Sequence, residues 1–224
     1  MNKFPRPTVL VSRCLEFENV RYDGHIIHSQ IVKDLEPYVD YIKVCPEVEI
    51  GLGVPRDPIR IVKINGEYRL IQPRTNRDVT QEMDDFTDNF LDKLPEVDGF
   101  IFKSGSPTIG IRNIKVYSGI QSAPVIEKRS GFFAKKILEK YDGYPIEEDD
   151  RLRNSRIRHH FLTKLFAFTE FRKVKSAESL DELIKFQKNH YYLFLTYNPE
   201  HCDELDSLIE NPYIRPIKDL LEDY

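Results

Sequence analysis

The sequence contains few cysteines and no long apolar run. Its 224 residues include only three cysteines, Cys14, Cys45 and Cys202, and no CxxC pair, which argues against a disulfide framework and a structural zinc site. No run reaches the roughly 18 apolar residues of a membrane-spanning helix, so we expect none. The N-terminal "MNKFPRPTVLVS" lacks the apolar segment and cleavage site of a signal peptide. We therefore expect a cytoplasmic protein with reduced thiols.

The chain also lacks an excess of positive charge. It has 33 basic and 37 acidic residues, a formal net charge of −4. Domains that bind nucleic acid in general are usually basic, so this balance argues against such a binder, although a mean charge hides local patches. The hydrophobic content of 40% is sufficient for a core, and the length allows one large domain with a small appendage.

Short apolar runs alternate with amphipathic segments over the first two thirds of the chain. Asn65-Gly66 between two apolar runs indicates a hairpin, because both turn residues tolerate positive φ. The alternation predicts an α/β fold with a mostly parallel, Rossmann-like sheet flanked by helices. The expected strands are Thr8–Ser12, Tyr38–Val44, Val97–Lys103 and Asn113–Tyr117, and the expected helices are Ile26–Leu35, Thr80–Leu94 and Ser130–Tyr141.

The remainder of the chain reads as helix. Apolar residues recur every three or four positions from Ile157 to Phe168, and the segment from Ala177 onward is rich in Leu, Tyr and Phe. Asn198-Pro199 and Asn211-Pro212 are expected to interrupt it. We predict an α/β domain over residues 1–174 and a small helical appendage over 175–224.

Three of the predicted strands end in chemically unusual turns. These turns read "SRC", "CPEVEIGLG" and "KSGSPTIG". Ligands of open α/β sheets bind beyond the carboxyl ends of the strands. If the three strands are neighbours, Cys14, Cys45 and the loop Ser104–Gly110 lie at one edge, and Glu47, Glu49, Gly51 and Gly53 line the same crevice. Thiolates are soft metal ligands, and two of them need a third from this loop, from Cys202 or from outside the chain.

Four ordered motifs carry a family resemblance. "SRCLEFENVRYDG", "VCPEVEIGLGVPRDPIR", "NRDVT" and "KSGSPTIG" together resemble the bacterial and archaeal thiouracil desulfidase family, also called domain of unknown function 523. The resemblance covers about residues 8–170. The segment "FQKNHYYLFLTYNPEHCDELDSLI" resembles the start of a helical domain, domain of unknown function 1722, which we expect to be present in truncated form.

The resemblance implies a [4Fe–4S] cluster held by three cysteines, whose open iron takes the sulfur of a thiolated nucleobase. Cys14 and Cys45 match the first two cysteines. The third normally lies in an "SPSCG" motif, and here that motif reads "SPTIG", with Ile109 in its place. Three outcomes stay open: Cys202 replaces the missing thiolate, Glu47 or another group ligates an iron, or the site has lost the cluster and binds something else.

Several other residues are candidates for this site. The resemblance implies an acid or base role for Glu47, and Ser104 and Ser106 are further catalytic candidates, although a loop ion pair and ordinary turn chemistry explain them equally well. The candidates for substrate binding are Arg21, Asp23, Gly51, Gly53 and Arg56. Asp23 can instead fix its loop by pairing with Arg21.

Two functions remain in competition at this point. The first is an enzyme that removes sulfur from a thiolated pyrimidine or similar thioamide through an iron–sulfur cluster. The second is a non-catalytic or repurposed domain that binds a small molecule in the same crevice and uses its helical tail for a partner or for homodimerisation.

Overall fold

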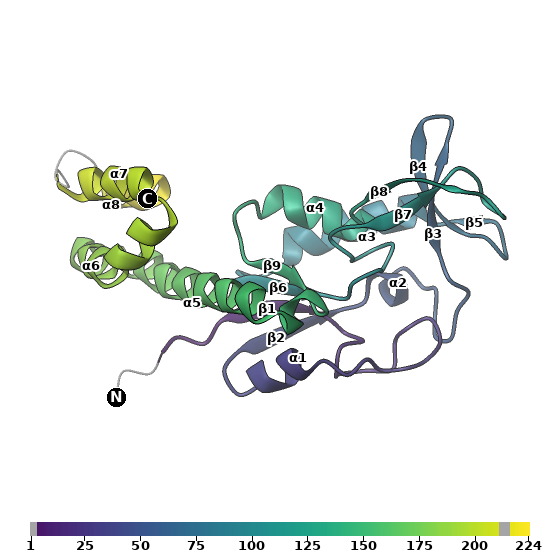
Figure 1. Cartoon of the computed structure of the whole chain (residues 1–224), viewed down its shortest axis with the longest axis horizontal. Coiled ribbons are helices and arrows are strands. Elements are labelled where there is room, and N and C mark those ends of the chain that lie inside the picture. Colours follow the sequence, from purple (N-terminus) through teal and green to yellow (C-terminus); the bar gives the residue numbers. More distant parts are fainter. Residues whose placement is uncertain (1–3, 211–215) are drawn as a thin grey trace. The chain divides into compact units, whose positions relative to one another are not determined.

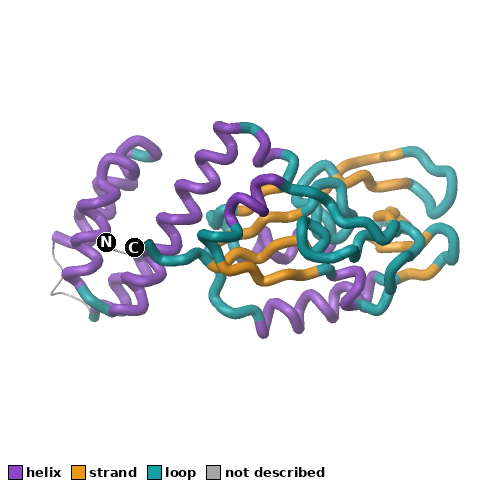
Figure 2. Tube along the Cα trace, turned by 90° about the horizontal axis from the view of Figure 1, so that it is seen from below, coloured by secondary structure: helices purple, strands orange, loops and turns teal. Residues whose placement is uncertain are grey.

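A computed structural model describes residues 4–210 and 216–224 (Figures 1 and 2). The chain divides into two compact units, an α/β unit, Arg6–Leu165, and a helical unit that comprises Met1–Pro5 and Phe166–Tyr224. The boundary expected near residue 174 falls inside helix α5 (Ser155–Ala177), which contributes residues to both units. The domain extents therefore stay a prediction.

A parallel sheet forms the centre of the α/β unit. Its order is β2 (Asp40–Val44), β1 (Thr8–Ser12), β6 (Gly99–Phe102) and β9 (Ile146–Glu148), and every neighbouring pair is parallel. β1 and β6 are buried along almost their whole length, as expected for strands covered on both faces. The predicted α/β fold is confirmed, and the first three strand ends are neighbours at one edge.

Helices cover both faces of this sheet, as Figure 2 shows for the purple helices and orange strands. Leu10 and Phe100 pack with side chains of α3 (Thr80–Lys93) and α4 (Phe132–Lys140) in one core cluster. Val9 and Val11 on the opposite face pack in a second cluster with side chains of α1 (Gln30–Leu35) and of the first turns of α5. Alternate residues of β1 thus contribute to two separate core clusters on the two faces of the sheet.

A second, mixed sheet completes the α/β unit. Its order is β5 (Arg77–Asp78), β4 (Glu67–Gln72), β3 (Arg60–Ile64), β7 (Ile114–Tyr117) and β8 (Val125–Arg129). Asn65 and Gly66 have φ of 52° and 86°, which confirms the hairpin between β3 and β4. The sequence pattern did not separate these strands into a sheet of their own, because strand periodicity says nothing about which strands pair.

Two predicted helices begin later than expected. The residues before α1 form loop structure instead, since Ile27 pairs with Leu15 and holds the turn after β1. Ser130 does not cap α4; Gly131 occupies that position and packs so closely on Thr108 that a Cβ would lie 2.4 Å from its carbonyl oxygen. The helix therefore begins after Gly131, where it packs against the loop that contains Thr108, and not at the predicted serine cap.

The helical unit continues with α6 (Leu180–Tyr197), α7 (Pro199–Glu210) and α8 (Ile217–Asp223). The Ser179 side chain accepts from Glu182 N and caps α6, and the predicted break at Asn198-Pro199 separates α6 from α7. The other predicted break, Asn211-Pro212, lies outside the described residues. Among the described helices, none is long and apolar enough to cross a membrane.

Candidate functional site

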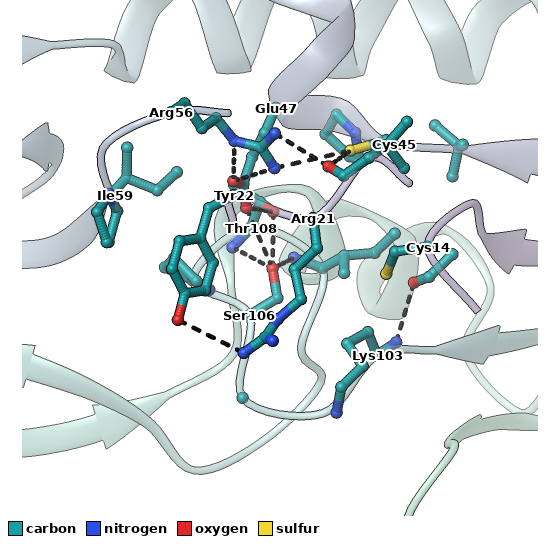
Figure 3. Close-up of a pocket in the computed structure, with 18 of the residues that line it drawn as sticks. Cys14, Arg21, Tyr22, Cys45, Glu47, Arg56, Ile59, Lys103, Ser106 and Thr108 are labelled. Carbon is teal, nitrogen blue, oxygen red and sulfur yellow. Dashed lines mark hydrogen bonds and ion pairs between the residues drawn. The ribbon is translucent and has the colours of Figure 1, made fainter. Parts of the chain in front are cut away.

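The carboxyl ends of β2, β1 and β6 surround a cavity of about 380 Å³. Arg13 N donates to Val44 O at 2.8 Å and Lys103 N donates to Ser12 Oγ at 2.9 Å, so the three strand ends are tied together. Figure 3 shows the side chains that converge there. Cys14, Cys45, Glu47, both predicted arginines and residues 103–109 line the cavity.

Glu47 is the most heavily engaged polar group in the cavity. It lies on the short helix α2 (Pro46–Glu49), which begins directly after Cys45. Its Oε2 pairs with Arg56 at 2.8 Å, and its Oε1 accepts from Thr108 Oγ1 at 3.0 Å and from Ser106 Oγ at 3.4 Å. Both carboxylate oxygens therefore have partners, and the group connects the second strand end to the third.

Each cation at the cavity is paired with a carboxylate. Arg56, whose side chain is 4% exposed, binds Glu47 and also donates to Val20 O and Gly53 O, both at 3.0 Å. Arg21 pairs with Asp23 at 2.6 Å and stacks on the Tyr22 ring.

Lys103 makes the third pair, with the buried Asp149 at 3.3 Å. Its Nζ also donates to Ser104 Oγ at 2.7 Å. The cavity thus carries almost no excess charge of its own.

The loop after β6 is fixed by its own backbone and by α4. Ser106 Oγ accepts from Thr108 N and Ile109 N, both at 3.3 Å, as serine does in tight turns. Phe132 N and Ala134 N of α4 donate to Pro107 O and Thr108 O at 3.2 and 3.0 Å. The first amides of a helix lack partners within it, and here they hold the cavity loop.

The two cavity thiols are held in the protonated state. Burial raises the pKa of Cys14 to about 12, and a smaller part of this increase comes from the nearby Cys45. Burial also raises the pKa of Cys45, against the opposing effect of a backbone hydrogen bond and the Arg56 guanidinium, whose Nη2 lies 4.0 Å from Cys45 Sγ. Neither thiol is a ready nucleophile at neutral pH.

The donor set does not fit a cluster bound by three cysteines. Ile109 is 4% exposed, belongs to the core cluster with Phe133, and has no donor atom. Glu47 could ligate an iron only by breaking its ion pair with the buried Arg56. Within residues 4–210 and 216–224, no group of three His, Cys, Asp or Glu side chains is arranged to hold a metal. Cys14 and Cys45 are the two thiols that line this cavity and could bind iron.

The Cys202 thiol is buried within the helical unit. Its side chain is 0% exposed inside the helical unit, where Sγ lies 3.9 Å from Tyr191 O. A thiol enclosed by its own unit cannot reach a ligand elsewhere without opening that unit. The first of the three outcomes left open by the sequence is thus not supported.

Some predicted residues lie beside the cavity and do not line it. Asp23 contacts it only through Arg21, and Gly51 and Gly53 lie in the turn after α2 with φ of 78° and 70°. Gly53 contributes its carbonyl oxygen to Arg56. The substrate-binding roles of these three residues, like the catalytic roles of Glu47, Ser104 and Ser106, stay predictions.

The sequence placed the loop that contains Lys103 and Thr108 at the site without giving either residue a role, and it did not point to Asp149. Asp149 follows β9, a three-residue strand within "YPIEEDD" that shows no alternation. The one available signal was the run Glu147–Asp149 itself, since buried carboxylates need partners.

The comparisons with known proteins agree with the motifs. The model of the 2-thiouracil desulfurase family matches residues 9–149. The uncharacterized protein YbbK of Bacillus subtilis (strain 168) is 28% identical over 153 residues, which are 64% of this chain and 97% of YbbK. A solved structure of the [4Fe–4S]-dependent thiouracil desulfidase TudS has 25% identity and a TM-score of 0.47, over 66% of this chain and 94% of that one. Because the family model spans more than half of the sequence, the chain belongs to the 2-thiouracil desulfurase family.

Proposed function

We propose that the cavity binds a thiolated pyrimidine or a similar thioamide, and that this chain is a binding member of its family that holds no cluster on three cysteines. One observation supports the proposal: Ile109, which replaces the third cysteine of the motif that the sequence resembles, is a buried core residue, while the rest of the cavity is assembled. The residues proposed to bind the ring are not the cysteines that would hold a cluster. The binding surface can therefore persist without the third cysteine.

The cavity suits a small planar ring with an N–H and a carbonyl or thiocarbonyl edge. Val20, Val44 and Ile59 provide apolar wall, and Tyr22 a ring face, while the polar groups are few and fixed, as in most ligand sites. Glu47 is an acceptor for a ring N–H, and the Ser106 hydroxyl can turn its one proton from Glu47 Oε1 to a ligand carbonyl or thiocarbonyl.

Arg21, Arg56 and Ser104 hold the walls in this proposal. Arg56 fixes Glu47, Arg21 orders the segment that carries Tyr22, and Ser104 orders Lys103. A fixed site loses less entropy on binding than a mobile one, so these contacts contribute to affinity without touching the ligand.

Calorimetric titration of the full chain with 2-thiouracil tests the proposal. We expect saturable binding that weakens about ten-fold in Ser106→Ala, because one hydrogen bond to the ligand is lost. Ser122→Ala, at an exposed position of the β7–β8 connection, is the matched control and should bind as the wild type does. Absence of binding to 2-thiouracil and to related thioamides would reject the proposal.

Sulfur removal is the competing function, and the two retained thiols favour it. Iron and sulfide analysis after anaerobic reconstitution separates the two functions. We expect no stable cluster in the wild type. Stoichiometric iron together with sulfide release from 2-thiouracil, both lost in Cys14→Ala and Cys45→Ala, would show that the chain is an active desulfidase.

A further inference from the structure

A second cavity of the α/β unit is lined by residues of α1 and of the first turns of α5, which cover the same face of the parallel sheet. Its volume is about 730 Å³, and all of its lining residues belong to the α/β unit. We call it the α1–α5 pocket. It shares no lining residue with the cavity that holds Cys14 and Cys45, so it is a separate candidate site.

Three cations line the α1–α5 pocket. Lys33 comes from α1, Arg153 from the short 3-10 helix η1 (Arg151–Arg153) and Arg158 from α5. None of the three forms an ion pair with a carboxylate within residues 4–210 and 216–224. A single unpaired Lys or Arg is ordinary on a surface, but cations that share one cavity repel one another, and a bound anion relieves that repulsion.

The carboxylates of the α1–α5 pocket have partners of their own. Glu16 Oε1 accepts from Ser29 N, and Asp34 Oδ1 accepts at 2.7 Å from the amide of the glutamine four residues before it. Asp149 pairs with Lys103 at 3.3 Å. The three cations are therefore left for a ligand.

Arg158 is held in position before any ligand binds. Its Nη1 donates to Leu152 O at 3.1 Å and to Arg153 O at 3.4 Å, which brings the two arginines together. Its Nε and Nη2 form no hydrogen bond in the described part of the chain, and both remain as donors. Two donors of a planar guanidinium match two oxygens of a phosphate, and a side chain that is already fixed loses less entropy on binding.

The local charge pattern also favours an anion here. The first turn of α5 contains Arg156 and Arg158 and no acidic residue, although cations are disfavoured at the start of a helix. Asn154 Oδ1 accepts from Arg156 N and Ile157 N, so the helix amides are occupied and the donors of the pocket are side chains. Residues that oppose a local preference are expected where function requires them.

The α1–α5 pocket is larger than a bare anion requires. Its volume lies in the usual range of sites for organic ligands, and Leu35 and Leu152 contribute apolar wall. The buried Asp149 also lines it. Asp149 Oδ1 accepts from Ser104 N and Lys103 Nζ, whereas Oδ2 has no hydrogen bond among the described residues and can accept one from a ligand hydroxyl.

From these contacts we infer that the α1–α5 pocket is a binding site for a small phosphate ester that carries hydroxyl groups. Arg153 and Arg158 bind the phosphate, Lys33 adds a third positive charge from α1, and Asp149 accepts from a hydroxyl of the organic part. The inference does not depend on what the cavity with the two thiols binds, because the two sites have different walls.

Calorimetric titration of the full chain with ribose 5-phosphate, inorganic phosphate and ribose tests the inference. We expect saturable binding of ribose 5-phosphate, weaker binding of inorganic phosphate and no binding of ribose. Affinity for ribose 5-phosphate should fall about ten-fold in K33Q/R153Q, because charge-assisted hydrogen bonds to the phosphate are lost. Both positions are exposed, so the urea midpoint should stay that of the wild type.

K93Q/R156Q is the matched control. It removes two positive charges at exposed positions, one in the last turn of α3 and one in the first turn of α5, and neither residue lines the α1–α5 pocket. It should bind ribose 5-phosphate as the wild type does. Three results would overturn the inference: no binding of ribose 5-phosphate by the wild type, equal loss of affinity in both double variants, or an affinity for ribose or for inorganic phosphate equal to that for the ester.

Discussion

Ile109 differs in chemistry from the cysteine of the motif that the sequence resembles, but its backbone is held by hydrogen bonds. Ser106 Oγ accepts from Ile109 N, and α4 binds the carbonyl oxygens of both preceding residues. A cysteine at this position would keep that backbone, and the two other thiols already line the cavity. We therefore predict that Ile109→Cys gains iron on anaerobic reconstitution, seen as a brown protein with iron and sulfide in equal amounts.

The matched control for this gain is Ile109→Ser, which has the same size but no thiolate. Both variants remove apolar volume from a buried position and should unfold about 2 kcal/mol more easily than the wild type. Only the cysteine variant should bind iron. Equal iron content in both variants, or none in either, would mean that position 109 is not the third ligand site of this chain.

Glu47 and Arg56 form an ion pair that is mostly removed from water. Their side chains are 12% and 4% exposed, respectively. Removing one member of such a pair leaves a buried charge, so Glu47→Ala should lower the free energy of unfolding by about 3 kcal/mol, as measured by urea denaturation. Glu49→Ala is the control: Glu49 is on the same short helix, 40% exposed and paired with Arg13, and its loss should cost less than about 1 kcal/mol. Similar costs for both would show that the Arg56 guanidinium is adequately bound by Val20 O and Gly53 O.

The end of β9 acts on the cavity through the loop after β6. Asp149 accepts from Ser104 N at 2.9 Å, Glu148 accepts from Ile111 N at 2.9 Å, and Glu147 pairs with Arg112 at 3.2 Å. Three consecutive carboxylates thus hold the start and the end of one loop. A strand of three residues is too short to contribute much as a sheet element, and its value lies in this placement of the carboxylates.

Asp149→Ala should loosen this loop. The variant leaves Ser104 N without its acceptor and Lys103 Nζ without its carboxylate partner, which costs about 2 kcal/mol, and amide hydrogen exchange at Ser104 should become faster than in the wild type. Asp150→Ala, at the exposed neighbouring position, should leave this exchange rate unchanged. Unchanged exchange in Asp149→Ala would mean that α4 alone holds the loop.

The sequence predicted those parts of the fold that rest on local pattern. β1 and β6 are short apolar runs and β2 is a mixed one, and the turns after them were recognisable from Cys14, Cys45 and the glycines of the loop. Their adjacency was a condition of the prediction that no local pattern establishes, and the order of the sheet confirms it. By contrast, the partner of Lys103 is Asp149, which lies 46 residues away in the sequence, and no local sequence pattern predicts such a pairing. The same holds for Gly131, whose contact with Thr108 displaced the expected serine cap.

For the whole molecule, buried phenols make stability dependent on alkaline pH. Burial raises the pKa of Tyr41, with a smaller contribution from Glu36, and its hydroxyl donates to Val32 O at 2.9 Å. Burial likewise raises the pKa of Tyr141 and of Tyr144. The folded state therefore retains phenol protons that the unfolded chain releases once the pH exceeds the ordinary value of 10.0.

The sign of the effect follows from proton linkage. Above pH 10 the unfolded chain binds fewer protons than the folded one, so the free energy of unfolding falls as pH rises, by up to about 1.4 kcal/mol per pH unit for each such tyrosine. Urea midpoints should be steady up to about pH 9 and fall beyond it. Tyr41→Phe should lose one tyrosine's share of this slope, whereas Tyr38→Phe, at a position 62% exposed, should keep the slope of the wild type. A Tyr41→Phe slope equal to the wild-type slope would show that this phenol ionises as readily in the folded protein as in the unfolded chain, and that its hydrogen bond to Val32 opens at no cost.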